Sequence, residues 1–179
     1  MPSPLGHTLA GLAVGWFGSA PARPGAAALR DNLTPAVLGC ACLAALPDAD
    51  LLIPHFHRTA THSVTATALV LIITAAVTAQ VTGRIQWRLA LCLAAAHATH
   101  LLMDWLGFDH NPPPGLQLLW PFDPTFYISG WDWFPATARE HLTWQMLSVN
   151  LYAAVFETVS VGPVALAAWA SWRWRSSQA

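Results

Sequence analysis

Lysine is absent from this chain of 179 residues, and charged residues of any kind make up only 9% of it. An average soluble domain carries about 25% charged residues, so this chain has too little polar surface to cover a soluble domain of its size. Disorder is excluded because disordered chains combine high charge with low hydrophobicity. No nucleic-acid partner is expected, because a net charge of −1 supplies no basic surface.

Cysteine is also scarce, and its spacing excludes two common uses. The three cysteines are Cys40, Cys42 and Cys92, and no pair has the CxxC spacing of zinc knuckles and redox motifs. We therefore expect all three to be small buried hydrophobic residues.

Hydrophobic residues make up 55% of the chain, and its mean hydropathy is +0.43. These values predict a polytopic helical membrane protein, and the gaps between charged residues mark out its helices. The clearest gap is the run 63–83, since about 20 apolar residues cross a bilayer. We expect one all-α domain over residues 1–179, with five membrane-embedded helices near 4–19, 33–47, 63–82, 86–106 and 143–172.

The positions of the arginines predict an orientation. Six of them fall on one side of a five-helix topology, namely Arg23, Arg30, Arg84, Arg88, Arg173 and Arg175. Cytoplasmic loops carry an excess of positive charge, so this side is expected to be cytoplasmic. The segment 107–142 is then an outer loop, in which Pro112–Pro114 exclude a regular helix and several tryptophans suit an interfacial belt.

Ionisable residues collect on the opposite, extracytoplasmic side of this topology. Ionisable groups near a bilayer are costly, so such a cluster is a functional-site hypothesis by default. The cluster consists of His7, Asp48, Asp50, His57, Arg58, His62, His100 and Asp104.

Two spacings on the fourth expected helix suit metal binding. His100 and Asp104 are four residues apart, so they share one helix face and can offer two ligands to one metal. His97 lies three residues before His100 on the same face.

Two other motifs flank the second and third expected helices. Pro47 is expected to end the second helix, and Asp48 and Asp50 would point the same way only if that stretch is extended. In the run HRTATHS, we expect Thr61 to cap the third helix while His62 faces inward from its first turn.

Imidazole and carboxylate groups together suit Zn²⁺ or Mn²⁺. Five or more such ligands exceed one tetrahedral site and would suit two ions, which activate water and stabilise the leaving oxygen in phosphoester hydrolysis. Arg58 would add a guanidinium fork that matches an anion.

Each of these residues could also have a purely structural role instead of binding a metal. His7 alone could be a hydrogen-bonded interior residue, and His100 with Asp104 could be a structural pair. Glu157 lies seven residues after Asn150 on roughly the same helix face. It could support the ligands from behind, or it could form a buried polar pair that holds helices together.

At these residues the sequence resembles the YdjM-like inner-membrane proteins, a bacterial family described as membrane-bound metal-dependent hydrolases. The likeness covers residues 6–122. It rests on the combination of GH, LPDAD, HRTATHS, HLLMD and LLWPF in this order.

The YdjM-like family is distantly similar to the zinc-dependent phospholipase C and P1 nuclease group, which is all-helical and uses a zinc cluster. That likeness implies that Asp104 is the carboxylate shared between two metals. It also implies a possible further ligand at His110, although no HxxxE motif follows it. The residues that match ligand positions are His7, Asp48, His62, His100 and Asp104.

We therefore expect a multi-pass inner-membrane hydrolase with one or two divalent ions, zinc or alternatively manganese. Its substrate would be a phosphoester in a lipid or lipid-linked molecule, cleaved by metal-activated water at the extracytoplasmic face. Asp50 or His57 would orient the water or serve as base, and Arg58 would bind the substrate anion. Two alternatives stay open, namely a metal-ion or proton transporter that uses the same cluster and a non-catalytic scaffold with a structural metal.

Overall fold

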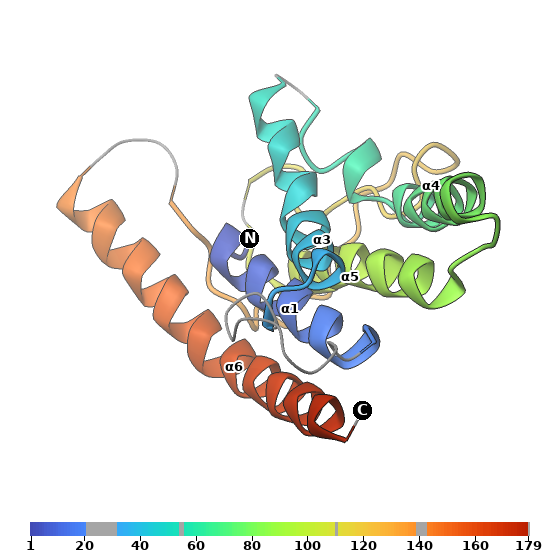
Figure 1. The fold of residues 1–179 in the computed structure, drawn as a ribbon. Helices are drawn as coiled ribbons and strands as arrows, with labels where there is room; N and C mark the ends of the chain where they lie inside the picture. Colours follow the sequence, from blue (N-terminus) through green and yellow to red (C-terminus); the bar gives the residue numbers. More distant parts are fainter. Residues whose placement is uncertain (21–31, 54–55, 110, 139–142, 179) are drawn as a thin grey trace.

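The computed structural model describes residues 1–20, 32–53, 56–109, 111–138 and 143–178 (Figure 1). Several residues considered above lie outside the described residues, namely Arg23, Arg30 and His110.

The regular structure of these described parts is helical. The α-helices are α1 (Pro4–Gly18), α3 (Pro35–Ala45), α4 (Val64–Thr82), α5 (Trp87–Leu106) and α6 (Trp144–Ser177). Two 3-10 helices, η1 (Leu46–Leu52) and η2 (Ala60–His62), join α3 to α4. Hydroxyl side chains cap four of the helices by accepting a first-turn N–H, as polar N-caps do, and these residues are Ser3, Thr34, Ser63 and Thr143.

The predicted helices are present, with two differences at their ends. The third helix is capped by Ser63, whose Oγ accepts from Ala66 N at 3.0 Å, so the prediction of Thr61 as the cap was wrong. The last helix continues to Ser177 and includes Arg175, whose side chain reaches back to α1. The predicted end at residue 172 lies directly before Arg173, which marks the end of the apolar part of the helix and not the end of the helix itself.

Helix α1 lies at the centre of the arrangement and packs against α3, α5 and α6, whereas α4 packs on α5 (Figure 1). Two glycines allow the close approach of α1 and α3. A Cβ on Gly11 would lie 2.5 Å from the carbonyl oxygen of Cys40, and one on Gly15 would lie 2.9 Å from Val37 Cα. Small residues at a helix interface are typical of membrane bundles, where backbones pack closely.

Within the described parts of the chain, four stretches are long and apolar enough to cross a membrane, namely Pro35–Leu52, Val64–Thr82, Trp87–Leu106 and Trp144–Ser177. Helix α1 has 15 residues and is therefore about 22 Å long, which is short of a hydrocarbon core of about 30 Å. The all-helical fold with apolar helices long enough to span a membrane is thus confirmed, with α4, α5, α6 and the combined stretch of α3 and η1 of sufficient length and α1 shorter.

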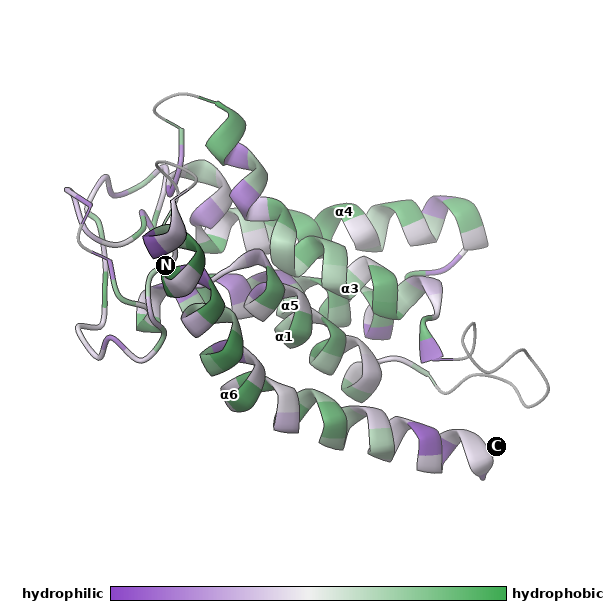
Figure 2. Ribbon diagram, turned by 90° about the vertical axis from the view of Figure 1, so that its left-hand side faces the viewer, coloured by the Kyte–Doolittle hydropathy of each residue, from purple (hydrophilic) through white to green (hydrophobic). Residues whose placement is uncertain are grey.

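Apolar residues run along α4 and recur along α6, as the hydropathy colouring shows (Figure 2), and many of their large apolar side chains are exposed. On α4, Ile72 is 60% exposed and Val81 is 79% exposed. Helices that are hydrophobic on every face belong in a large core or in a membrane, and here no protein covers these side chains among the described residues. The surface is therefore the one that lipid would cover.

The cysteines follow the expectation in two cases out of three. Cys40 and Cys92 are buried with their sulfur atoms 3.4 Å apart, whereas Cys42 is exposed. The prediction for Cys42 was wrong because residues two apart on a helix point to nearly opposite sides.

The connection after α5 has no helix in its described part, as Pro112–Pro114 predicted. Isolated bridges join Gly107 to Phe134 and Leu116 to Tyr127. Asp123 accepts hydrogen bonds from Thr125 N and the Tyr127 hydroxyl. Hydrogen bonds from Thr125 and Tyr127 lower the pKa of Asp123, and the bond to Asp123 raises the pKa of Tyr127. The connection thus carries internal polar contacts outside the helices.

Two arginines meet the C-terminal end of α1. Arg88 Nε donates to Gly18 O at 2.7 Å, and Arg175 Nη2 donates to Trp16 O at 2.7 Å and to Phe17 O at 3.1 Å. Cations near the last carbonyls of a helix are favourable because of the helix dipole. These arginines lie at the opposite end of α1 from His7.

Candidate metal centre

Helix α1 places His7 one turn from its start. The imidazole is fully buried, and neither of its nitrogen atoms has a hydrogen-bond partner among the described residues. Its ring stacks on that of His100 with centroids 3.8 Å apart, and its Nε2 lies 3.5 Å from Asp104 Oδ1. A buried polar side chain without a partner is costly, so His7 is poised for a ligand that it can bind.

The aspartates of LPDAD lie on η1, which follows α3 directly. The stretch is a 3-10 helix, so the two carboxylates point to different neighbours and the extended alternative is wrong. Asp48 Oδ1 lies 3.9 Å from His62 Nε2 and 4.0 Å from His100 Nε2, while its Oδ2 is buried without a partner. Asp50 instead faces the segment that contains His57.

Helix α5 carries His100 and Asp104, and both are fully buried. Asp104 Oδ2 lies 3.1 Å from His100 Nε2 and 3.4 Å from His62 Nε2. Neither carboxylate oxygen of Asp104 has a hydrogen-bond partner, although imidazole nitrogens surround it. Such an arrangement leaves the carboxylate available to a cation.

The second nitrogen of each imidazole indicates which atom faces the cluster. His100 Nδ1 donates to the carbonyl oxygen of Ala44 at 2.7 Å, and His62 Nδ1 lies 3.0 Å from Asp50 Oδ2. Since carbonyls and carboxylates only accept, both Nδ1 atoms must carry the proton. Each neutral ring then presents a lone pair at Nε2, and the two Nε2 atoms are 3.0 Å apart. Two lone pairs at this distance repel each other unless a metal ion or a shared proton lies between them.

Asp50 organises the histidines from behind. Its carboxylate accepts from His57 Nδ1 at 2.7 Å, Thr61 Oγ1 at 2.5 Å and Arg58 N at 3.3 Å, in addition to His62. A carboxylate that holds the far nitrogen of a histidine is the usual support of a metal ligand, because it sets the tautomer and the ring orientation. Thr61 therefore contributes to this support rather than to a helix cap.

Three groups of side chains have ligand atoms within 4.8 Å of one another and could hold a metal ion. The groups are His7 with Asp48 and His100, His62 with His100 and Asp104, and Asp48 with His57 and His62. All five ligands predicted from the sequence fall within them. The groups share Asp48, His62 and His100, so the same residues could serve one ion or two.

The donor set fits a divalent metal of the zinc or manganese type. It combines imidazole nitrogen with carboxylate oxygen, which these metals accept. Among the described residues, five of the seven buried side-chain atoms without a hydrogen-bond partner belong to the predicted ligands His7, Asp48 and Asp104, where a cation would satisfy them. Asp48 lies near two imidazoles and Asp104 near three, so either could be a shared carboxylate.

His97 does not join these groups. Its Nδ1 lies 2.9 Å from Thr67 Oγ1, so this buried imidazole links α5 to α4. Although His97 precedes His100 by one turn of α5, its side chain faces Thr67 on α4 and not the metal groups.

Arg58 lies at the edge of the centre and pairs with an acid of the connection after α5. Its Nη1 forms an ion pair with Asp109 and donates to Asn111 O at 3.3 Å. Asp109 also accepts from Gly115 N at 2.9 Å, and Phe126 lies under the guanidinium at 5.9 Å. The pairing of Arg58 with Asp109 was not predicted from the sequence, although the opposite charge of Asp109 on the same side of the topology was a usable signal.

Glu157 supports the start of α1 from α6. Its fully buried carboxylate accepts from Ser3 N at 2.7 Å, from the Ser3 hydroxyl and from Gly6 N at 3.1 Å. A Cβ on Gly6 would lie 2.6 Å from Glu157 Oε2, so glycine is needed beside His7. This buried polar contact joins α6 to the start of α1, as the interpretation of Glu157 as a residue that holds helices together predicted, whereas Asn150 bonds both backbone groups of Ala138.

Comparison with known proteins gives one result. No curated protein and no solved structure matched the chain. The family model described as YdjM inner membrane protein matches residues 1–176, which is nearly the whole chain. The chain therefore belongs to the YdjM inner membrane protein family.

Proposed function

We propose that this protein is a membrane-bound metal-dependent hydrolase that cleaves a phosphoester in a lipid or lipid-linked substrate. One observation supports it above all others. Imidazole Nε2 atoms and unpartnered carboxylate oxygens from α1, η1, η2 and α5 converge on one buried point. Zinc is the first choice of metal and manganese the second.

The chain's own residues divide into three roles. His7, Asp48, His62, His100 and Asp104 would hold one or two ions, which when bound activate water for attack on a phosphoester. Asp50 holds the Nδ1 protons of His57 and His62, so its first role is to position these rings. His57 would act as base or join the metal ligands, and Arg58 would attract the substrate anion, with part of its charge compensated by Asp109.

Access to the centre supports a catalytic role. His57 is the most exposed member of the groups, with 22% of its side chain accessible, whereas His62, His100 and Asp104 are fully buried. A catalytic metal site keeps one position open, while a structural site closes its coordination with protein ligands. The side of His57 would be the substrate entrance.

Apolar side chains beside this entrance support a lipid substrate. Between Asp50 and His57, Leu52 is 86% exposed, Ile53 is 54% exposed and Phe56 is 47% exposed. Exposed apolar side chains next to a polar site suit a membrane surface, where a lipid head group meets the centre without leaving the bilayer. The extracytoplasmic leaflet, inferred from the arginines, would be the location.

A transporter is a weaker candidate. Toward the arginine end, the cluster is followed by a packed apolar group of Cys40, Cys92 and Ala96, with Val14 and Leu93 against it. An ion pathway needs polar groups through the bilayer, and the described residues continue the cluster only to His97 and Thr67. Ion flux in proteoliposomes would favour this alternative over hydrolysis.

The test is the metal content of the detergent-purified protein after supplementation with zinc or manganese. We expect one or two ions per chain, and loss of the metal in His100→Ala and Asp104→Ala. His97→Ala is the matched control, because this residue is a buried histidine of the same helix outside the metal groups. Full metal content in His100→Ala would overturn the assignment.

The metal-loaded protein would then be assayed on p-nitrophenyl phosphate and on phosphatidic acid in mixed micelles. Hydrolysis that disappears in Asp104→Ala and persists in His97→Ala would support the proposed activity. Bound metal without hydrolysis of either phosphoester would favour the structural-metal scaffold.

A further inference from the structure

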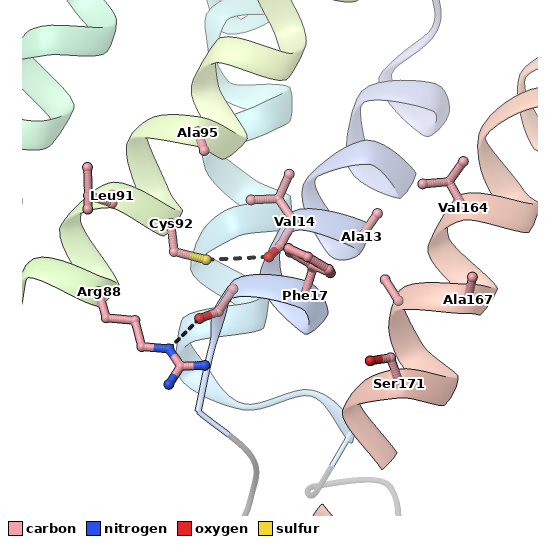
Figure 3. A pocket seen from close by; sticks show the side chains of 12 residues that line it. Ala13, Val14, Phe17, Arg88, Leu91, Cys92, Ala95, Val164, Ala167 and Ser171 are labelled. Carbon is pink, nitrogen blue, oxygen red and sulfur yellow. Dashed lines mark hydrogen bonds between the residues drawn. The ribbon is translucent and has the colours of Figure 1, made fainter. Parts of the chain in front are cut away.

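A groove lies between α1, α5 and α6, in the half of the bundle away from the metal centre (Figure 3). Its volume is about 730 Å³, within the range of pockets that hold small ligands. Most of its lining is apolar and includes Phe17, Leu91, Ala95, Val164 and Ala167. The groove begins at Ala13 on α1, about 9 Å along the helix from His7, so it is separate from the metal site.

The polarity of the groove changes along its length. Arg88 on α5 and Ser171 on α6 lie on opposite sides of the groove in the lower half of Figure 3, while Ala95 and Val164 lie toward the other end. Arg88 Nε donates to Gly18 O at 2.7 Å and Nη2 to Ser19 O at 3.2 Å, which fixes the guanidinium beside the groove. Among the described residues, Arg88 forms no ion pair with an acid. Its positive charge is therefore available to an anion.

The helices that border the groove indicate which kind of ligand can occupy it. α5 and α6 are both long and apolar enough to cross a membrane, so a groove between their outward faces opens onto lipid. An occupant that matches this groove is an apolar chain with a negative group at the end next to Arg88. Basic side chains between spanning helices are a common site for anionic lipid head groups.

We propose that this groove binds an acyl chain of an anionic phospholipid, with the lipid phosphate beside Arg88. The guanidinium fork meets phosphate oxygens, and the side chains of α5 and α6 hold the hydrocarbon. A helix from a second copy of this chain would fill the apolar part of the groove but would bring no anion to Arg88. The site is independent of the proposed hydrolase, because none of its lining residues belongs to the metal groups.

The charge requirement is tested by native mass spectrometry of delipidated protein in detergent, titrated with phosphatidylglycerol or with phosphatidylcholine of the same acyl chains. We expect about fivefold tighter binding of phosphatidylglycerol, the effect of one basic residue near an anionic lipid. Arg88→Gln should abolish this preference. Arg84→Gln is the matched control, since Arg84 lies just before α5 and outside the groove.

The groove itself is tested by a steric change. Ala167→Trp should remove binding of both lipids, whereas Ala76→Trp on the exposed face of α4 should retain it. Ala167→Trp leaves Arg88 and its contacts in place, so it decides the case if Arg88→Gln fails to fold. Equal binding of the two lipids, or lipid binding that survives Ala167→Trp, would overturn the proposal. A dimer that dissociates in Ala167→Trp would overturn it in favour of a second copy as the occupant.

Discussion

The two ends of α1 use polar side chains in opposite ways. At its start, His7 is buried among carboxylates and imidazoles, and several of these groups have no hydrogen-bond partner. At its end, Arg88 and Arg175 donate to backbone carbonyls, and the space beside them is an apolar groove. The first end needs a cation to satisfy its buried atoms, while the second end stabilises a helix terminus. Chemistry is therefore expected at the first end.

The largest expected effect is at the metal end. His62→Ala removes a ring whose Nε2 lies between Asp48 and Asp104, and we expect zinc binding to weaken more than about 100-fold. Zinc at 100 times its dissociation constant should stabilise the wild type by about 2.7 kcal/mol and leave His62→Ala without a comparable gain. Chelator competition and thermal unfolding would measure both. Equal zinc affinity in His62→Ala and wild type would remove the contrast between the two ends.

A smaller effect is expected behind the ligands. Asp50→Asn replaces the carboxylate that holds the Nδ1 protons of His57 and His62, and we expect metal affinity to fall about 10- to 100-fold. Thr61→Val removes one donor to the same carboxylate and should cost less than about tenfold. The same chelator competition applies, and an Asp50→Asn protein with wild-type affinity would show that the tautomers are set without this carboxylate.

The link between α6 and α1 should act mainly on stability. Glu157→Ala leaves Ser3 N and Gly6 N buried without their acceptor, and we expect a loss of about 1–3 kcal/mol in the free energy of unfolding. Glu157→Gln keeps an acceptor oxygen and should lose less. Thermal unfolding followed by circular dichroism measures both variants. If Glu157→Ala and Glu157→Gln are both as stable as the wild type, the carboxylate does not hold the start of α1.

The smallest effect is expected at the arginine end. Arg175→Gln removes two hydrogen bonds to the last carbonyls of α1 and should cost about 1 kcal/mol or less, with metal content unchanged. The exposed Arg173 offers a matched control in Arg173→Gln. Loss of metal in Arg175→Gln would show that the two ends are coupled.

The helices could be predicted because their signal is local. The predicted limits of the third and fourth helices, 63–82 and 86–106, agree with α4 and α5 to within one residue. Charges are excluded from apolar spans, so the positions of arginine and aspartate delimit them directly. The connection between Asp48 and His62 was less predictable, because its 3-10 turns depend on which side chains Asp50 attracts.

The gathering of His7, Asp48, His62, His100 and Asp104 at one end also followed from the sequence alone. Helices that cross a membrane alternate in direction, so the position of a residue near a helix end decides the side on which it lies. The i,i+4 spacing of His100 and Asp104 added a shared face. These are statements about position, and they leave open which atoms meet.

The sequence by itself therefore determined the membrane class, the helices and the end at which the ionisable residues gather. Only the tertiary structure decided which partner each polar group takes. Arg58 meets Asp109 across 51 residues of sequence, and Glu157 meets Ser3 across 154. Hydropathy and helix periodicity act over one or two turns, whereas hydrogen bonds and ion pairs form only within about 3–4 Å. Such contacts depend on how whole helices pack, and no local pattern encodes that.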